Sequence, residues 1–223
     1  YYWDSYFTQL GLLRSGRTAQ VRDMLDNFDH AIKLIGFVPN GFRSYFLTRS
    51  QPPFFSSMVA DYGRAIGDLE GSFARYLPAM ESEYHFFMAT PRNHEGLARH
   101  WDSGDGPRIE MYATDLHWQD HAQDHPEFFR DLRAACESGW DFSSRWLSDP
   151  TDLGTIRTTR IWLVDLNCLL LRMEELLAEA TADCAPERSA QYAAAADTRR
   201  AAISERFFDP ERGYFFDLSI EDG

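Results

Sequence analysis

The segment AACESGWDFSSRW, residues 134–146, places Asp141 between an aromatic residue and a turn of small hydroxyl residues. Aromatic neighbours such as Trp140 and Phe142 partly desolvate a carboxyl group, and desolvation raises its pKa. A carboxyl group that keeps its proton near neutral pH can protonate a leaving group, which is the chemistry of glycoside hydrolysis. The alternative is structural: Asp141 caps a short helix that begins at Phe142.

Residues 1–7, YYWDSYF, combine a cluster of aromatic side chains with one acid. The ring of Trp3 offers a flat apolar face on which a sugar ring can stack. The carboxylate of Asp4 can accept hydrogen bonds from hydroxyl groups. The alternative is that this segment is only the start of a helix, with Asp4 as its cap and Trp3 in the core.

A second group lies in PNGFRSYFLTRSQPP, residues 39–53. Asn40 and the glycine after it are a turn signal. Arg49, Ser50 and Gln51 come immediately before two prolines. Because prolines restrict the backbone, such a loop can point Arg and Gln donors into a pocket at a small entropic cost. The alternative is a solvated surface loop.

A third group lies in WDSGDGPRIE, residues 101–110, where Arg108 and Glu110 flank Ile109. In an extended chain, side chains two residues apart point the same way. Both charges would then face one ligand. The alternative is a local, exposed ion pair.

His117, His121 and His125 are spaced by four residues, with Asp120 and Asp124 between them. This spacing is similar to a metal-binding helix face, but an HExxH motif is absent and a proline follows directly. We therefore expect no metal site. The sequence also has no Walker loop, GxGxxG or GxSxG motif, which leaves nucleotide binding and nucleophilic serine chemistry without support.

The composition narrows the class of partner. The 223 residues carry a net charge of −13. Because such a chain repels phosphate groups, we expect neither nucleic acid nor an anionic membrane as partner, and a neutral substrate fits better. The three cysteines, Cys136, Cys168 and Cys184, lack a zinc-type spacing, and their odd number slightly favours a reducing compartment.

Apolar residues recur with a helical period along most of the chain, which predicts an all-α protein. Short strands are predicted only near residues 42–47 and 214–218. The long polar loops at 36–53 and 88–126 are predicted to be functional. Pro126 is predicted to stand in the first turn of its helix. The predicted helices cover residues 5–14, 18–36, 54–65, 71–88, 127–137, 165–182 and 186–207.

Taken together, the motifs resemble the α,α-trehalase family of inverting glycosidases. The matching segments are YYWDSYFTQLGLL, IGFVPNGFRSYFLTRSQPPFF, ESGWDFSSRW, RTT at 157–159 and VDLN at 164–167, in family order. Phe42, Phe46 and Ile109 depart mildly from the family pattern. The resemblance implies an (α/α)6 barrel with its site at the loop-rich end.

The resemblance also implies residue roles. Asp141 would be the general acid on the glycosidic oxygen of trehalose, and Gly139 would contribute a backbone group to the subsite. No metal or organic cofactor is implied. The residues implied to hold the glucose of the cleaved subsite are Trp3, Asp4, Asn40, Arg49, Ser50, Gln51, Arg108 and Glu110.

In trehalases the catalytic base is a Glu in a later Gly-rich segment, and neither that segment nor a QWD segment occurs in this sequence. We therefore expect residues 1–223 to form a single, partial (α/α)6 catalytic domain. Barrel closure would need residues beyond 223, in cis or from another chain, and the isolated piece would be inactive. Two alternatives stay open: a non-catalytic sugar-binding or scaffolding fragment, and an (α/α)6 glycosidase for another disaccharide. Trehalases occur in periplasm and cytoplasm, and the cysteine count slightly favours the cytoplasm.

Overall fold

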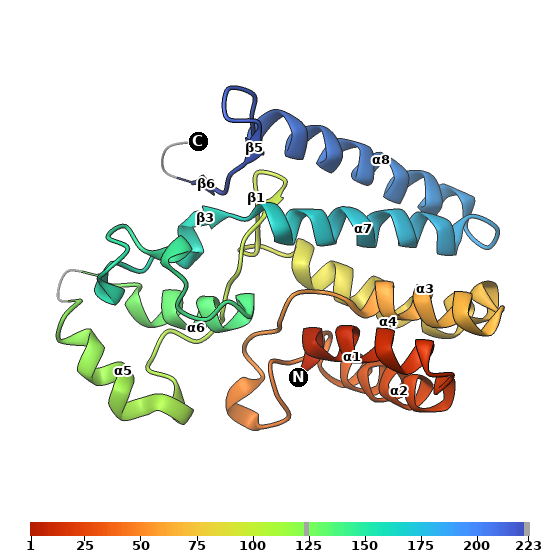
Figure 1. Ribbon diagram of the computed structural model, residues 1–223, viewed down its shortest axis with the longest axis horizontal. Coiled ribbons are helices and arrows are strands. Elements are labelled where there is room, and N and C mark those ends of the chain that lie inside the picture. Colours follow the sequence, from red (N-terminus) through yellow and green to blue (C-terminus); the bar gives the residue numbers. More distant parts are fainter. Residues whose placement is uncertain (123–124, 221–223) are drawn as a thin grey trace.

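The computed structural model describes residues 1–122 and 125–220, and α-helices make up most of them (Figure 1). Short 3-10 turns and two-residue strands occupy the connections between the helices. The α-helices are α1 (Tyr2–Arg14), α2 (Thr18–Ile35), α3 (Phe55–Ile66), α4 (Leu69–Met88), α5 (Tyr112–Gln119), α6 (Phe128–Ser138), α7 (Val164–Thr181) and α8 (Pro186–Ala202).

Three antiparallel helix pairs, α1–α2, α3–α4 and α7–α8, form the scaffold (Figure 1). Within each pair, residues 15–17, 67–68 or 182–185 make a short turn. The long connections, residues 36–54 and 89–163, lie at the opposite end of the helices. Helices α5 and α6 belong to the second of these. The segments that carry the predicted site residues are therefore gathered at one end of the scaffold.

One hydrophobic core joins the helices. Helix α2 shows how the sequence builds it: its buried apolar residues recur every three or four positions, so they form one face. The same spacing buries one face of α3, α6 and α7 in the same cluster. The buried apolar positions of α2 are Val21, Leu25, Phe28, Ala31 and Ile32.

Two-residue strands form three pairs in the described part of the chain, and one of these pairs joins segments far apart in sequence. Strand β1 (Asn93–His94) pairs with β2 (Leu97–Ala98), and β4 (Phe208–Asp209) pairs with β5 (Tyr214–Phe215). Strand β3 (Ile161–Trp162), directly before α7, pairs with β6 (Leu218–Ser219). The β3–β6 pair therefore places the segment around residue 217 at the N-terminal end of α7.

The structure corrects several predicted boundaries. The segment at 42–47 holds a 3-10 turn, η1 (Ser44–Phe46), and no strand. Pro126 lies outside α6, which begins at Phe128. Helix α8 ends at Ala202, and a π-helical turn, η6 (Ile203–Phe207), replaces its last predicted residues.

Helix α5 lies inside the loop predicted at 88–126. The one buried side chain of this helix is Asp115, so the helix has no apolar stripe. The spacing of apolar residues in the sequence therefore could not indicate a helix here. Among the described residues, no helix has both the length and the hydropathy that crossing a membrane requires.

Candidate active site

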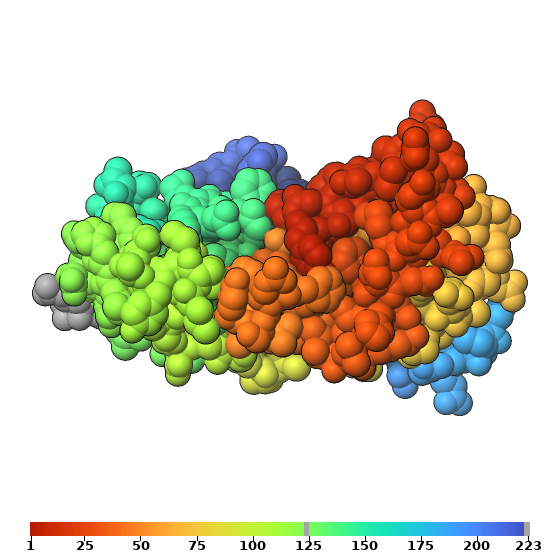
Figure 2. All heavy atoms as spheres, turned by 90° about the horizontal axis from the view of Figure 1, so that it is seen from below, coloured from red at the N-terminus to blue at the C-terminus, as the bar shows by residue number. Residues whose placement is uncertain are grey.

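A pocket of about 400 Å³ opens at the end of the scaffold where the long connections lie. Figure 2 shows the face on which the N-terminal segment (red), the segment after α2 (orange) and the segment before α7 (green) adjoin. Every predicted site residue except Ser50 and Arg108 lines this pocket, and Phe46 and Cys136 join them. The lining residues are Trp3, Asp4, Asn40, Phe46, Arg49, Gln51, Glu110, Cys136, Gly139 and Asp141.

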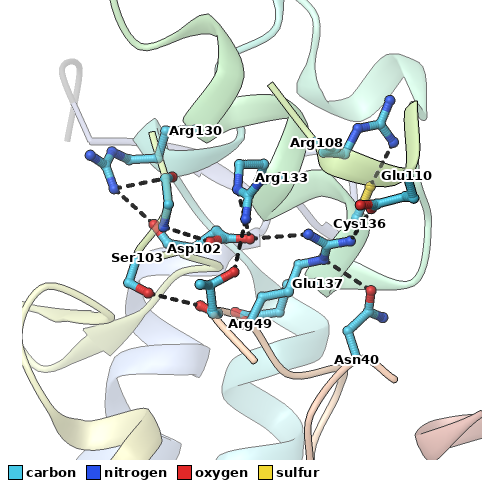
Figure 3. A network of polar contacts seen from close by, with 12 residues as sticks. Asn40, Arg49, Asp102, Ser103, Arg108, Glu110, Arg130, Arg133, Cys136 and Glu137 are labelled. Carbon is cyan, nitrogen blue, oxygen red and sulfur yellow. Dashed lines mark hydrogen bonds and ion pairs between the residues drawn. The ribbon is translucent and has the colours of Figure 1, made fainter. Parts of the chain in front are cut away.

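Arg49 is the best-anchored side chain of the pocket (Figure 3). Its Nε donates to Oδ1 of Asn40 at 2.9 Å, and its Nη2 donates to Oε1 of Glu110 at 2.7 Å. Its Nη1 contacts Oδ2 of Asp102 at 3.3 Å. Only 1% of Arg49 is exposed, so the alternative of a solvated surface loop is wrong. Two carboxylates offset its charge, so the pocket has no need of an anionic ligand there.

Asp102 also holds Arg49 in place, although no motif in the sequence indicates this residue. It is fully buried, and its Oδ2 also lies 3.2 Å from Nε of Arg133. Its Oδ1 accepts a hydrogen bond from the backbone N–H of Gly104 at 2.7 Å. Buried carboxylates are stable only when charge and hydrogen bonds compensate them, and here two guanidinium groups do so.

Glu137, near the end of α6, binds together the segments that carry the site residues. Its carboxylate accepts from the backbone N–H of Ser50 at 2.8 Å and of Trp101 at 3.1 Å. It also accepts from Nη1 of Arg92 and from Nδ1 of His100, the latter at 3.1 Å. Burial alone would raise the pKa of Glu137, but Arg92 and His100 lower it to about 2. Glu137 is therefore ionised near neutral pH, although it is buried.

Ser50 belongs to this support and does not line the pocket. Its Oγ donates to the backbone carbonyl of Val38 at 2.6 Å, and the side chain is fully buried. Its hydroxyl therefore has a protein partner. Its contribution is to fix the backbone between Arg49 and Gln51.

Arg108 and Glu110 do not point the same way, because residues Ile109–Met111 form a 3-10 turn and the chain there is not extended. Arg108 makes a two-pronged contact with Asp115 of α5, with Nε–Oδ2 at 2.9 Å and Nη2–Oδ1 at 2.6 Å. Its Nη1 donates to Sγ of Cys136 at 3.2 Å, directly behind the pocket lining. The alternative of a local ion pair is also wrong, because Glu110 binds Arg49 instead. Oε2 of Glu110 is buried and has no hydrogen-bond partner among the described residues.

The first turn of α1 forms one wall of the pocket. Oε1 of Gln51 accepts from the backbone N–H groups of Tyr2 at 2.8 Å and Trp3 at 3.4 Å, which satisfies donors that a helix start leaves free. The hydroxyl of Tyr2 accepts from the backbone N–H of Phe55 at 2.8 Å and donates to buried Glu83.

Gly139 ends α6 in the left-handed conformation, with φ +72°. A Cβ at this position would lie 2.6 Å from Cε2 of Trp3, so only glycine lets the indole approach this closely. The close contact explains why Trp3 and Gly139, far apart in sequence, form adjacent parts of the lining.

Asp141 is exposed, so the desolvation expected from its aromatic neighbours is not present here. Its backbone also has a positive φ, +47°. It caps no helix: Ser143 caps the 3-10 turn η3 (Ser144–Trp146) by accepting from the backbone N–H of Arg145 at 3.3 Å. The capping alternative for Asp141 is therefore wrong, and its carboxylate is free to face the pocket.

The described residues of the histidine series have contacts within the protein. His125 contacts Asp131 at 3.1 Å and the backbone carbonyl of Ile156 at 2.6 Å, whereas His121 turns toward the carbonyl of His117. No group of three or more metal-ligating side chains occurs within residues 1–122 and 125–220. Asp124 lies outside the described residues.

The pocket lining suits a neutral ring that carries many hydroxyl groups. Trp3 offers an apolar face, while Asp4 and Glu110 offer acceptors and Asn40 and Gln51 offer amides. The Arg49 charge is already compensated. Asp141 adds one carboxyl group, which makes no hydrogen bond or ion pair to the other residues that the structure describes.

Comparisons with known proteins agree with this chemistry. The chain is 47% identical to a periplasmic trehalase of Pseudomonas aeruginosa over 97% of its own length and 43% of that protein. It is 41% identical to a periplasmic trehalase of Escherichia coli over 99% of its length and 42% of that protein. The chain thus spans less than half the length of these curated relatives.

These names correct the expected location. The relatives from Pseudomonas aeruginosa, Xanthomonas oryzae and Escherichia coli are named periplasmic trehalases, so the preference for the cytoplasm is contradicted. The cysteine count was a poor guide, because the helical core buries its apolar side chains without any disulfide and all three thiols are free.

The fold matches a solved structure, the neutral trehalase of Saccharomyces cerevisiae, with a TM-score of 0.84 and 26% identity. The match covers 99% of this chain and 46% of the yeast chain, which confirms the prediction of an all-α, partial (α/α)6 barrel. The trehalase family model matches residues 1–223. Sequence, fold and pocket lining agree, and the chain belongs to the trehalase family.

Proposed function

We propose that these residues supply the general-acid side of an α,α-trehalase, which hydrolyses trehalose to two glucose molecules with inversion. One observation carries the proposal: side chains from four segments far apart in sequence line one pocket at the loop end of the scaffold. These segments are residues 3–4, 40–51, 110 and 139–141. Their order and types match the family motifs.

In this mechanism the glucose of the cleaved subsite stacks on Trp3, and the lining carboxylates and amides bind its hydroxyl groups. Asp141 donates its proton to the glycosidic oxygen as the C–O bond breaks. A base on the opposite face takes a proton from the attacking water, with the two carboxyl groups roughly 6.5–9.5 Å apart. The base is expected outside residues 1–223, because they contain no Gly-rich segment with a Glu.

We propose that residues 1–223 act as one partial catalytic unit. The helix pairs α1–α2, α3–α4 and α7–α8 would form one side of an (α/α)6 barrel. The remaining helices would come from the same polypeptide or from another chain. The match to less than half of the yeast trehalase supports this division.

The first test changes Asp141 in the protein encoded by the complete reading frame that contains these residues. Asp141→Ala is expected to lower kcat for trehalose by about 10²–10⁴-fold, the usual contribution of a general acid. Trehalose should still bind, as measured by calorimetry, because within residues 1–122 and 125–220 the Asp141 side chain makes no hydrogen bond or ion pair to another lining residue. Asp197→Ala, an exposed carboxylate of α8, serves as the control. Retained hydrolysis by Asp141→Ala would reassign the acid.

The second test separates trehalose from other disaccharides. Glucose release is measured from trehalose, maltose and kojibiose with the same protein. Hydrolysis of trehalose alone supports the proposal. Faster hydrolysis of another disaccharide identifies a different (α/α)6 glycosidase, and binding without any hydrolysis identifies a sugar-binding protein.

A further inference from the structure

We propose that Arg145 is a positioning residue for the acid loop, defined as residues 139–146: it clamps the backbone that aims Asp141 at the leaving group. This inference rests on the proposed hydrolysis of trehalose. It gives a role to the SSRW and VDLN motifs, which the pocket lining does not use.

The position of Asp141 depends on its backbone. Within residues 1–122 and 125–220, its carboxylate has no hydrogen-bond or ion-pair partner that would fix it from the side-chain end. Its φ of +47° is unusual for a residue with a Cβ, and such a conformation persists only where the surroundings enforce it. One direct support is visible: Nε1 of buried Trp146 donates to the backbone carbonyl of Asp141 at 2.9 Å.

Arg145 holds this loop from two sides. Its guanidinium carbon lies 5.1 Å from the ring centre of Trp140 and 4.9 Å from that of Trp146. Both distances are within the range of cation–π attraction. One of these indoles precedes Asp141 directly and the other binds its carbonyl, so the guanidinium group connects the two sides of the acid.

The guanidinium group is in turn fixed to the scaffold. It makes a two-pronged contact with Asp217, with Nε–Oδ2 at 2.9 Å and Nη2–Oδ1 at 3.0 Å, and its Nη1 donates to Asp165 at 2.9 Å. Two-pronged contacts fix direction as well as distance. Oδ1 of Asp217 also accepts from the backbone N–H of Val164 at 3.0 Å, and Oδ1 of Asp165 accepts from that of Leu166 at 2.8 Å.

Asp217 is held in place by the strand pair that follows it. Leu218 of β6 is the partner of Trp162 in β3, immediately before α7. Arg145 therefore connects the acid loop to the N-terminal end of α7. Loss of that arginine removes this connection without removing any lining residue of the pocket.

The choice of substrate distinguishes a misplaced acid from a damaged pocket. Trehalose releases a glucose alkoxide, which needs the Asp141 proton as the C–O bond breaks. α-D-Glucosyl fluoride releases fluoride, which leaves without protonation. Both substrates use the same glucose subsite and the same attacking water. A variant that misplaces only the acid should therefore lose activity on trehalose selectively.

The experiment uses the protein encoded by the complete reading frame, with Arg145→Gln, Arg145→Lys and Asp217→Asn. For Arg145→Gln we expect kcat/KM for trehalose to fall by about 10²-fold and that for α-D-glucosyl fluoride to fall by less than about threefold. The loss should lie mainly in kcat. Arg145→Lys keeps the charge but not the two-pronged contact, and should be intermediate. Arg200→Gln, an exposed arginine that also pairs with two carboxylates, is the matched control and should behave as wild type.

Equal proportional losses on both substrates, or no loss on either, would overturn the role of Arg145. If melting shows that Arg145→Gln is unfolded, Asp217→Asn decides the question, because it weakens the clamp and keeps the arginine. A wild-type protein that does not hydrolyse trehalose would instead refute the proposed function. The two failures are thus distinguishable.

Discussion

At the scale of single residues, the pocket depends on buried carboxylates that do not touch its interior. Asp102 and Glu137 hold Arg49 and Ser50 in place. The residue types of the lining were predictable from sequence, because aromatic and hydrogen-bonding side chains cluster in motifs. The supporting carboxylates were not, because each is joined to partners far away in sequence and carries no local pattern.

Ser50 and Arg108 were predicted to hold the glucose, but their side chains do not line the pocket. Both stand beside lining residues in the sequence, yet their side chains bind Val38 and Asp115. Neighbouring side chains diverge in irregular backbone, and a one-dimensional motif does not record their directions. Asp141 illustrates a further limit, because its aromatic neighbours in sequence leave it exposed in the structure.

Glu83 of α4 gives a prediction for pH dependence. Burial raises its pKa from 4.5 to about 8, although the hydrogen bond from Tyr2 opposes the shift. Between these pH values the folded protein keeps a proton that the unfolded chain releases, so stability should fall as the pH rises through this window. Glu83→Gln cannot ionise and should therefore lose less thermal stability than wild type between pH 5 and pH 9.

Thermal melting at several pH values checks this prediction. Glu70→Gln is the control, because Glu70 is an exposed residue of the same helix. Its melting curve should keep the pH dependence of the wild type. An identical pH dependence for Glu83→Gln and wild type would show that Glu83 does not carry a proton into the folded state.

At the scale of elements, the sequence predicted the long helices well and the connections poorly. Helix α2 has an apolar stripe, and Gly36 in the left-handed conformation caps it directly after Ile35, so both its existence and its end were predictable from the sequence. Helix α5 has no stripe, and strands β3 and β6 are too short to show alternation. Such elements exist because tertiary contacts hold them, and their own sequences do not encode them.

The end of α6 gives a prediction at this scale. Gly139→Ala would place a Cβ against the indole of Trp3, whereas Gly213→Ala, at φ +65°, meets no atom within 4 Å. Both changes should destabilise the protein by about 1 kcal/mol, the cost of a left-handed residue with a Cβ, and the clash with Trp3 adds to this cost at Gly139. Only Gly139→Ala should also raise KM for trehalose, by about tenfold, or about 1.4 kcal/mol.

Steady-state kinetics and melting of both variants provide the measurement. The Gly213→Ala control measures the effect of backbone strain without the clash with Trp3. If Gly213→Ala raised KM as much as Gly139→Ala, the close packing of Trp3 on Gly139 would have no role in substrate binding.

At the scale of the whole molecule, large apolar side chains lie open to solvent. Leu34 is 70% exposed, Ile109 is 68% exposed and Trp140 is 52% exposed. Exposed apolar surface of this kind favours association. The match to under half of the yeast trehalase is consistent with a surface that other helices cover.

Residues 1–223 produced alone should therefore associate or aggregate, and should not hydrolyse trehalose at rates typical of the family. Light scattering measures the association, and glucose release measures the activity. Full-length protein at the same concentration is the control. A clean monomer with a cooperative melting transition, or robust turnover, would contradict the view that these residues are half of a working barrel.

The contacts of Glu137 imply an order of events during synthesis. Its donors Ser50, Arg92 and Trp101 lie 87, 45 and 36 residues before it in the chain. The helix pairs close over short turns and can form as they leave the ribosome, whereas contacts over long separations wait for both partners. The loop that carries Arg49 and Gln51 is therefore made early but acquires its final shape only when α6 has emerged.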